Sequence, residues 1–312
     1  MLINTFFTII ASVILFLFSI KKFSKQIHNL GGDKIKKTLE IATMTPLRGV
    51  ATGAILTAIV QSSTAVTIIL VGLVDVGVIT FYNSLGVILG ANIGTTLTSQ
   101  LVAFKIIYFA PYLVVLSFLL EHTNSRYQKY AKAVFYFGLV FLSLFFIMIV
   151  TEPLQRNPFI LGIFSNISNI YLAVLAGIIA TVILQSSSVV SGILILLVAQ
   201  GFFDFNQAFG IILGANIGTT STAMITSLIM NASAKKTAIA HLLFNVIGVL
   251  LFIPFINRFS AFIDTFQLSS DKSVALAYLL FNLINATLFI FFLNYFHQLI
   301  NKVYRVFYKS EE

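Results

Sequence analysis

QSSTAVT (residues 61–67) lies in the middle of a long apolar segment, and QSSSVVS (residues 185–191) lies in the middle of a second one. The apolar flanks of both elements are 12 or 13 residues long. At 1.5 Å per residue a helical flank reaches about 20 Å, whereas a bilayer core is about 30 Å thick. We therefore predict that each segment forms a re-entrant helical hairpin with its QSS element at the tip. The flanks are 48–60 and 65–76 in the first hairpin, and 172–184 and 189–200 in the second.

The composition places these hairpins in a membrane protein. Of 312 residues, 58% are hydrophobic and only 9% are charged, whereas a soluble domain carries about 25% charged residues. A soluble chain of this length could not bury so much apolar surface, so we predict an all-α polytopic membrane protein. The absence of cysteine excludes disulfides and thiolate chemistry. The candidate full spans are 2–20, 78–101, 105–120, 132–151, 205–229, 237–256 and 273–297.

The basic residues indicate which side of the membrane each loop faces. The formal net charge of +9 would also suit nucleic-acid binding, but 15 of the 19 Lys and Arg residues fall in four segments. Such clustering is typical of cytoplasmic loops, and these segments carry no nucleic-acid recognition motif. We therefore expect a lipid bilayer as partner and no nucleic acid, with the N-terminus outside and the C-terminus in the cytoplasm. The four segments are 21–48, 121–132, 235–236 and 302–309.

Segment 21–47 is too charged to cross a membrane, because it contains six lysines. Two interpretations stand side by side. The segment either forms two helical parts along the cytoplasmic interface, broken at Gly31-Gly32, or it is a solvated loop.

The chain contains an internal duplication. Residues 53–96 align with 177–220 at a constant offset of 124 without gaps, and 24 of the 44 positions are identical. GANIGTT occurs at 90–96 and again at 214–220. Three predicted crossings separate the two hairpins, and an odd number inverts the second copy relative to the first. Inverted repeats are typical of secondary transporters that work by alternating access.

These observations predict two inverted repeats, each with a re-entrant hairpin and a helix broken at GANIGTT, plus an extra C-terminal transmembrane helix. In each GANIGTT, we expect Gly to free the backbone and Asn to supply an acceptor. For the GxxxG ladder that runs through GANIGTT we expect close helix packing as the main role. The predicted divisions are 1–130 for the first repeat, 131–258 for the second, and 259–312 for the final helix and cytoplasmic tail.

The polar residues of the repeats suit both an anion and a cation. The N-terminal ends of helices 65–76 and 189–200 offer free N–H groups for an anion. The C-terminal ends of 48–60 and 172–184 offer carbonyls for Na⁺, and hydroxyls serve either ion. Packing or hydrogen bonding within a helix would explain a single copy, but it explains two aligned copies less well. The candidate anion and sodium ligands are Gln61, Ser62, Ser63, Thr64, Asn92, Thr95, Thr96, Gln185, Ser186, Ser187, Ser188, Asn216, Thr219 and Thr220.

Two related stretches, AIAHLLFN at 238–245 and ALAYLLFN at 275–282, add supporting candidates: His241, Asn245 and Asn282. They either line or support the site, or they make hydrogen bonds between helices. No ionisable residue clearly lies at a membrane centre, which argues against a proton pump. No enzyme motif is present, so we expect no catalytic residues and no cofactor other than sodium as coupling ion.

The paired QSSTA and QSSSV elements, each followed by GANIGTT, together with AHLLFN, resemble the sodium-dependent phosphate cotransporter family, that is, the type II sodium–phosphate cotransporters and their bacterial relatives. The resemblance covers residues 48–300. It implies symport of Na⁺ and inorganic phosphate through the QSS elements, in a bacterial inner membrane. It also implies a short form without the C-terminal PhoU-like domain of many bacterial members. A homo-oligomer and a separate PhoU-like partner remain open.

Other functions stay open at this point. Hydroxyls and helix ends do not specify phosphate, so sodium-coupled transport of another small anion, such as a dicarboxylate, is the first alternative. Export of phosphate or sodium is a second, since some bacterial members are thought to run outward. An anion channel or a phosphate sensor is a remote alternative, which the inverted repeats disfavour.

Overall fold

A computed structural model describes residues 2–42, 44–123, 127–165, 167 and 169–308, and every regular element in that part of the chain is a helix. Residues 124–126, the middle of the predicted cytoplasmic segment 121–132, lie outside the description. The α-helices are α1 (Leu2–Ala42), α2 (Pro46–Val60), α3 (Ser63–Asp75), α4 (Phe81–Ala103), α5 (Ala110–Glu121), α6 (Gln128–Thr151), α7 (Pro158–Ser165), α8 (Ile170–Leu184), α9 (Ser187–Ala199), α10 (Phe205–Ser227), α11 (Ala232–Phe252), α12 (Ile256–Asp264), α13 (Ser270–Phe291) and α14 (Leu293–Phe307).

Six helical stretches in the described chain are long and apolar enough to cross a membrane, which confirms a multi-pass protein. Two predicted spans need correction. Residues 106–121 form one apolar helical stretch, a 3₁₀ turn followed by α5, that is shorter than the six candidate spans; Lys105, whose backbone is left-handed (φ 61°), separates it from α4. The span 273–297 ends at Phe291, and Phe292 separates it from α14. The six stretches are Ile3–Gly31, Phe81–Ala103, Tyr130–Gln155, Phe205–Ser227, Ala232–Asp264 and Ser270–Phe291.

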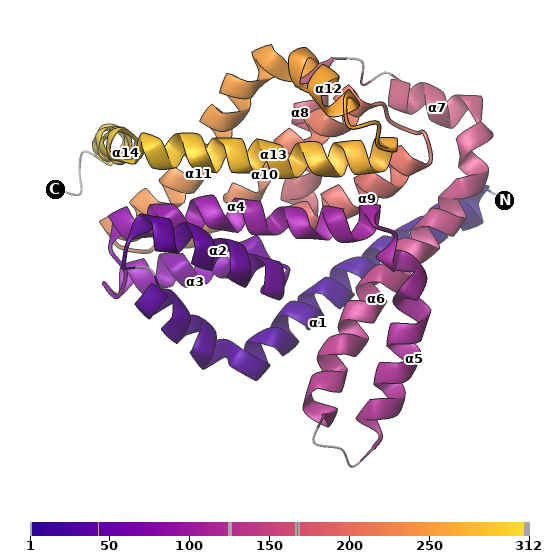
Figure 1. Ribbon diagram of the computed structural model, residues 1–312, viewed down its shortest axis with the longest axis horizontal. Helices are drawn as coiled ribbons and strands as arrows, with labels where there is room; N and C mark the ends of the chain where they lie inside the picture. The colour runs from indigo at the N-terminus through magenta and orange to yellow at the C-terminus, as the bar shows by residue number, and fades with distance from the viewer. Residues whose placement is uncertain (1, 43, 124–126, 166, 168, 309–312) are drawn as a thin grey trace.

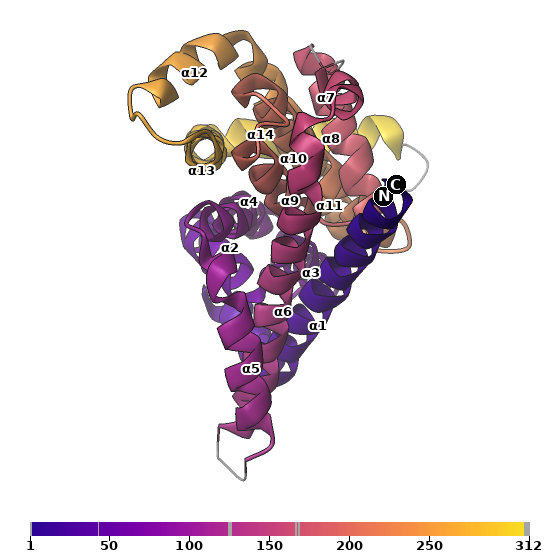
Figure 2. The ribbon, with the colours of Figure 1, turned by 90° about the vertical axis from the view of Figure 1, so that its right-hand side faces the viewer.

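Helix α1 continues well beyond the predicted first span. It runs from Leu2 to Ala42 and bends at Gly31, whose backbone is not helical. The predicted break at Gly31 is therefore confirmed, and the helical form of 21–42 excludes a solvated loop. Beyond its first turns α1 packs against α6, and with α5 the two helices form an arm that extends from the rest of the bundle (Figures 1 and 2).

The sequence duplication extends to the backbone. Helices α2, α3 and α4 have the same bounds as α8, α9 and α10 when 124 is added to each residue number. Both QSS elements separate two short helices, because Gln61 (φ 55°) and Gln185 (φ 53°) adopt the left-handed conformation that ends a helix. A helix break at each predicted tip is thus confirmed. The inversion of the repeats and the depth of the hairpins in the membrane stay predictions.

The glycine ladders pack helices together, as predicted. Helix α4 lies along α2, and α10 lies along α8. A Cβ on Gly90 would collide with the carbonyl oxygen of Val50, and a Cβ on Gly214 would collide with that of Val174. Only glycine allows the two backbones of each pair to approach this closely.

The predicted helix breaks at GANIGTT are wrong. Helices α4 and α10 run without interruption through 90–96 and 214–220. The polar side chains of the motif donate to carbonyls of their own helix: Asn92 Nδ2 to Ile88 O (3.0 Å) and Thr95 Oγ1 to Ala91 O (2.9 Å). These bonds satisfy the side chains without opening the backbone, while the glycines serve packing.

Candidate functional site

The two QSS tips come together at one cavity. Its volume is about 440 Å³, and it is lined by both glutamines and by the serine that follows each of them. Further lining residues come from α1 and, in Thr222, from α10, so that four separate parts of the chain enclose the space. The polar and charged lining residues are Lys21, Ser24, Lys25, His28, Gln61, Ser62, Thr64, Gln185, Ser186 and Thr222.

Each tip presents the beginning of a helix to the cavity. Ser62 is the N-cap of α3, and its Oγ accepts a hydrogen bond from Ala65 N at 3.2 Å. Ser186 is the N-cap of α9, and its Oγ accepts from Val189 N at 3.4 Å. Both helix N-termini therefore direct backbone N–H groups and partial positive charge towards the tip, which favours an anion.

The two glutamines differ in their surroundings. Gln61 is 8% exposed; its Nε2 donates to Ala58 O at 2.6 Å, and its Oε1 accepts from Thr98 Oγ1 at 2.7 Å. Gln185 is exposed, and its side chain forms no hydrogen bond with the described residues. Thr222 stands where Thr98 stands in the first repeat, yet it lines the cavity without bonding Gln185. The first tip is therefore tied to its own repeat and the second is not.

The α1 residues are the part of the cavity that the sequence did not reveal. Lys21, Ser24, Lys25 and His28 follow one another at helical spacing, so they share one face of α1. In the sequence, these lysines indicate only which side of the membrane the segment faces. Their i, i+4 and i+7 spacing was a signal for a basic helix face, but only the fold shows that this face covers the tips.

The remaining candidates from the tips lie behind the cavity. Thr64 lines it, whereas Ser63, Ser187 and Ser188 are buried at 6%, 3% and 3% exposure and do not. Their hydroxyls sit in the first turns of α3 and α9.

None of the GANIGTT candidates lines the cavity. All of them are buried, and the threonines bond within their own helix, as Thr219 Oγ1 does to Ala215 O (2.9 Å). Since both helices are unbroken, a sodium site formed by opened backbone at this motif is not available in this conformation. The residues concerned are Asn92, Thr95, Thr96, Asn216, Thr219 and Thr220.

Asn216 instead belongs to a buried polar cluster between α10 and α13. Its Oδ1 accepts from Tyr278 Oη at 2.9 Å, and its Nδ2 donates to Asn282 Oδ1 at 3.3 Å. Asn282 thus makes a hydrogen bond between two helices, which is one of the two roles expected for it. On α11, Asn245 Nδ2 donates to His241 O (3.0 Å), and His241 Nδ1 is buried without a partner among the described residues.

Four further hydroxyls are buried without a hydrogen-bond partner in the described structure, those of Thr57, Thr67, Ser99 and Thr181. Two of them, on Thr57 and Thr181, occupy equivalent positions of the repeats. Thr57 and Thr181 lie on α2 and α8, one turn before each tip glutamine, and both are 0% exposed. Each sits beside a GANIGTT glycine, Gly94 or Gly218. A buried oxygen that lacks a donor calls for a water or a cation, and neutral oxygens are the ligands that suit Na⁺. In the described residues, no group of three His, Cys, Asp or Glu side chains gathers as a metal site.

Comparisons with known proteins identify the family of the chain. A family model described as Na⁺/Pi-cotransporter matches residues 15–148 and 160–267. The protein YqeW of Bacillus subtilis is 32% identical over 274 residues, which cover 87% of this chain and 88% of the relative.

Two relatives have names that state a transported ion. The "Putative inorganic phosphate export protein YjbB" of Salmonella typhimurium is 29% identical over 215 residues, 68% of this chain and 40% of the relative. The human "Sodium-dependent phosphate transport protein 2C" is 44% identical over 85 residues, 26% of this chain and 14% of the relative. No solved structure matches the chain. Since the family model covers most of the sequence, this chain belongs to the Na⁺/Pi-cotransporter family.

Proposed function

We propose that this protein carries inorganic phosphate across the membrane together with Na⁺, by alternating access. The observation that carries the proposal is the single cavity where both QSS tips meet, in a chain whose family is one of phosphate transporters rather than enzymes. The cavity brings together two helix N-termini and a basic face of α1, and both attract an anion.

The anion would bind between the tips and α1. Backbone N–H groups in the first turns of α3 and α9 supply directed donors, while Lys21 and Lys25 supply full positive charge. Charge-assisted hydrogen bonds to oxyanions are about twice as strong as neutral ones. A dicarboxylate would meet the same donors. The choice of phosphate as substrate therefore rests on the family to which the chain belongs and not on the chemistry of the cavity.

Sodium would bind at the ends of α2 and α8. There the last-turn carbonyls point towards each tip, and the unpaired hydroxyls of Thr57 and Thr181 lie one turn away. The equivalent placement supports one sodium position in each repeat. An inverted relation of the repeats would then let the two tips open to opposite sides, as an alternating-access carrier requires.

The ion gradients across the membrane set the direction of net transport by such a carrier. A relative named for phosphate export supports outward movement as a second candidate. The same cavity would serve either direction.

Flux in proteoliposomes tests the proposal. We expect ³²P-phosphate uptake that requires an inward Na⁺ gradient and disappears when choline replaces Na⁺. Succinate in excess should not compete if phosphate is the substrate. Uptake that persists without Na⁺ would rule out the coupling, and competition by succinate would move the substrate to a dicarboxylate.

A charge variant tests the cavity itself. Lys21→Gln/Lys25→Gln should raise the phosphate KM about tenfold, because two charges that face the cavity are lost. Lys22→Gln is the matched control, since Lys22 does not line the cavity and its Nζ lies 5.4 Å from the Phe18 ring centre. Equal KM values in all three proteins would exclude α1 from the site.

A further inference from the structure

Helix α14 leaves the last membrane span at a sharp change of direction. Helix α13 ends at Phe291, and after Phe292 the chain continues as α14, which Figures 1 and 2 show running across α13 rather than along it. Three aromatic side chains at this junction are exposed: Phe291 by 80%, Phe292 by 55% and Tyr295 by 73%. Exposed aromatic rings at the end of a span are typical of the membrane–water interface.

One face of α14 is fixed against the bundle. Leu293, Phe296 and Ile300 are buried. From α11, Lys235 Nζ lies 4.9 Å from the Tyr308 ring centre, and Lys236 Nζ lies 5.0 Å from that of Tyr304. The helix is therefore a built part of the fold with a defined outer face.

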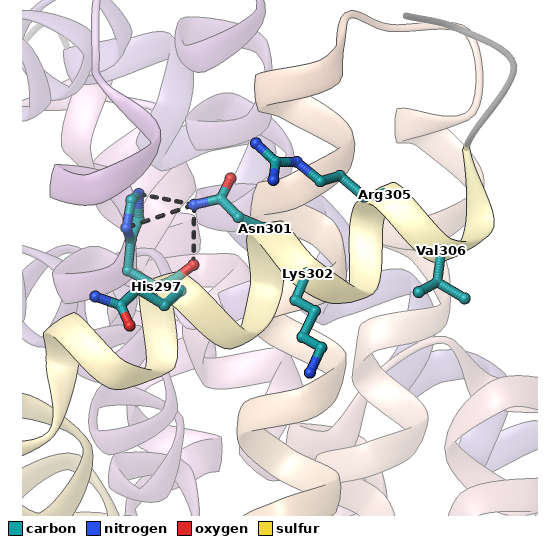
Figure 3. A pocket seen from close by; sticks show the side chains of 6 residues that line it. His297, Asn301, Lys302, Arg305 and Val306 are labelled. Carbon is teal, nitrogen blue, oxygen red and sulfur yellow. Dashed lines mark hydrogen bonds between the residues drawn. The ribbon is translucent and has the colours of Figure 1, made fainter.

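The outer face of α14 carries a polar and basic groove. Its volume is about 820 Å³, larger than the cavity at the tips. In Figure 3 Asn301 and Arg305 project upward from the helix, whereas Lys302 and Val306 project downward, and all four line the groove. No acidic residue lines the groove, and within the described chain neither cation has an acidic partner.

His297 closes one end of this groove in its neutral form. Asn301 Nδ2 donates to His297 O at 3.0 Å (Figure 3). Burial, and then the nearby charge of Lys236, lower the pKa of His297. The positive charge of the groove near pH 7 therefore comes from Lys302 and Arg305.

An apolar groove lies on the neighbouring side of the same helix. It has a volume of about 480 Å³ and is lined by Ile247, Leu251, Leu288, Phe289, Phe292, Tyr295, Phe296 and Leu299. Tyr295, Leu299, Lys302 and Val306 follow at spacings of four, three and four residues, so they form one stripe along α14. Lys302 thus marks the boundary between the basic and the apolar groove.

We propose that α14 binds an anionic phospholipid. The phosphodiester lies against Lys302 and Arg305, the amide of Asn301 bonds the headgroup, and an acyl chain lies in the apolar groove. A soluble phosphate would use the charges and leave the apolar groove empty, whereas a phospholipid fills both. The residues of this site are distinct from those of the tip cavity, so the inference does not depend on transport.

Lipid-dependent stability of the purified protein tests the site. We expect short-chain phosphatidylglycerol to raise the melting temperature at concentrations where phosphatidylcholine of equal chain length does not. Lys302→Gln/Arg305→Gln should weaken the apparent affinity for phosphatidylglycerol about 30-fold, since each cation at an anionic lipid surface contributes a several-fold factor. Both side chains are exposed, so the variant should fold.

Three controls make the result decisive. Lys22→Gln/Arg258→Gln removes two exposed charges elsewhere and should bind phosphatidylglycerol as the unaltered protein does. Lys302→Arg/Arg305→Lys keeps the charges and should retain most of the affinity. Leu299→Asn should weaken binding without any change of charge. Equal stabilisation by both lipids, protection by inorganic phosphate that matches phosphatidylglycerol and is lost in the Lys302→Gln/Arg305→Gln variant, or undiminished binding of phosphatidylglycerol by that variant would overturn the proposal.

Discussion

The two repeats have the same helix bounds but treat their tip glutamines differently. In the first repeat Gln61 is buried and tied to Thr98 and Ala58. In the second repeat Gln185 is exposed, and Thr222, the counterpart of Thr98, forms no hydrogen bond with it. Equal helix bounds with unequal side-chain bonds fit one conformation of the alternating-access carrier proposed above. We interpret the first tip as locked and the second as released.

The largest expected effect concerns the close, glycine-dependent helix packing that both repeats share. Gly90→Ala and Gly214→Ala each place a methyl group against a carbonyl of the paired helix, and overpacking of this kind costs about 1–3 kcal/mol or more. Both variants should lose folded protein, seen as a lower melting temperature and an aggregated fraction in size-exclusion chromatography. Gly72→Ala is the control, because open space surrounds Gly72 on α3; it should be neutral or stabilising. If Gly90→Ala were stable while Gly214→Ala was not, the two helix pairs would not be equivalent in their packing.

A second, smaller effect concerns sidedness. The chain has no cysteine, so Ser62→Cys and Ser186→Cys report cleanly on each tip. Both positions line one cavity in this conformation, so the two sides should be seen in different states. We expect a membrane-impermeant thiol reagent to modify Ser62→Cys mainly from the cytoplasmic side and Ser186→Cys mainly from the outside, each in the state in which its own tip is open, with a preference of about tenfold. Modification of both variants from the same side under all sodium and phosphate conditions would contradict an inverted arrangement.

The smallest effect separates the two tips. Thr98→Val removes the hydroxyl that holds Gln61, and the net loss of about 1 kcal/mol for one hydrogen bond corresponds to roughly a fivefold shift. The population with a released first tip should rise by this factor, which the modification rate of Ser62→Cys measures. Thr222→Val removes no bond to Gln185 and should leave the rate at Ser186→Cys unchanged. Equal responses of the two tips would show that Thr98 locks nothing.

Much of this architecture was predictable from sequence. The alignment at an offset of 124 predicted the paired elements, and the short apolar flanks predicted a helix break at each QSS. The glycine ladder predicted close helix pairs. These features are local or repeated, so the chain alone contains them.

Other features depend on tertiary contacts and were not predictable in the same way. The sequence predicted Asn92 and Thr95 as ligands at a helix break. A side chain that donates to a carbonyl of its own helix cannot be told in the sequence from one that coordinates an ion. The basic face of α1 looked like a topology signal, because only packing places Lys21 and Lys25 over the tips. The separation of α14 from α13 occurs at Phe292, where the sequence has no glycine or proline that would predict a helix end.

The left-handed backbone at Gln61 and Gln185 has a further consequence for how such proteins evolve. Glycine is the usual residue at a helix end of this kind, and a side chain there costs about 1–2 kcal/mol. A Gln185→Gly variant should therefore melt at a higher temperature, because the exposed Gln185 side chain makes no hydrogen bond with the described residues. Gln61→Gly relieves the same backbone cost but loses the bonds to Ala58 and Thr98, so it should gain no stability. If the tips carry phosphate as proposed, the stabilised Gln185→Gly variant should transport less of it, and stability and transport would then make opposite demands on one side chain.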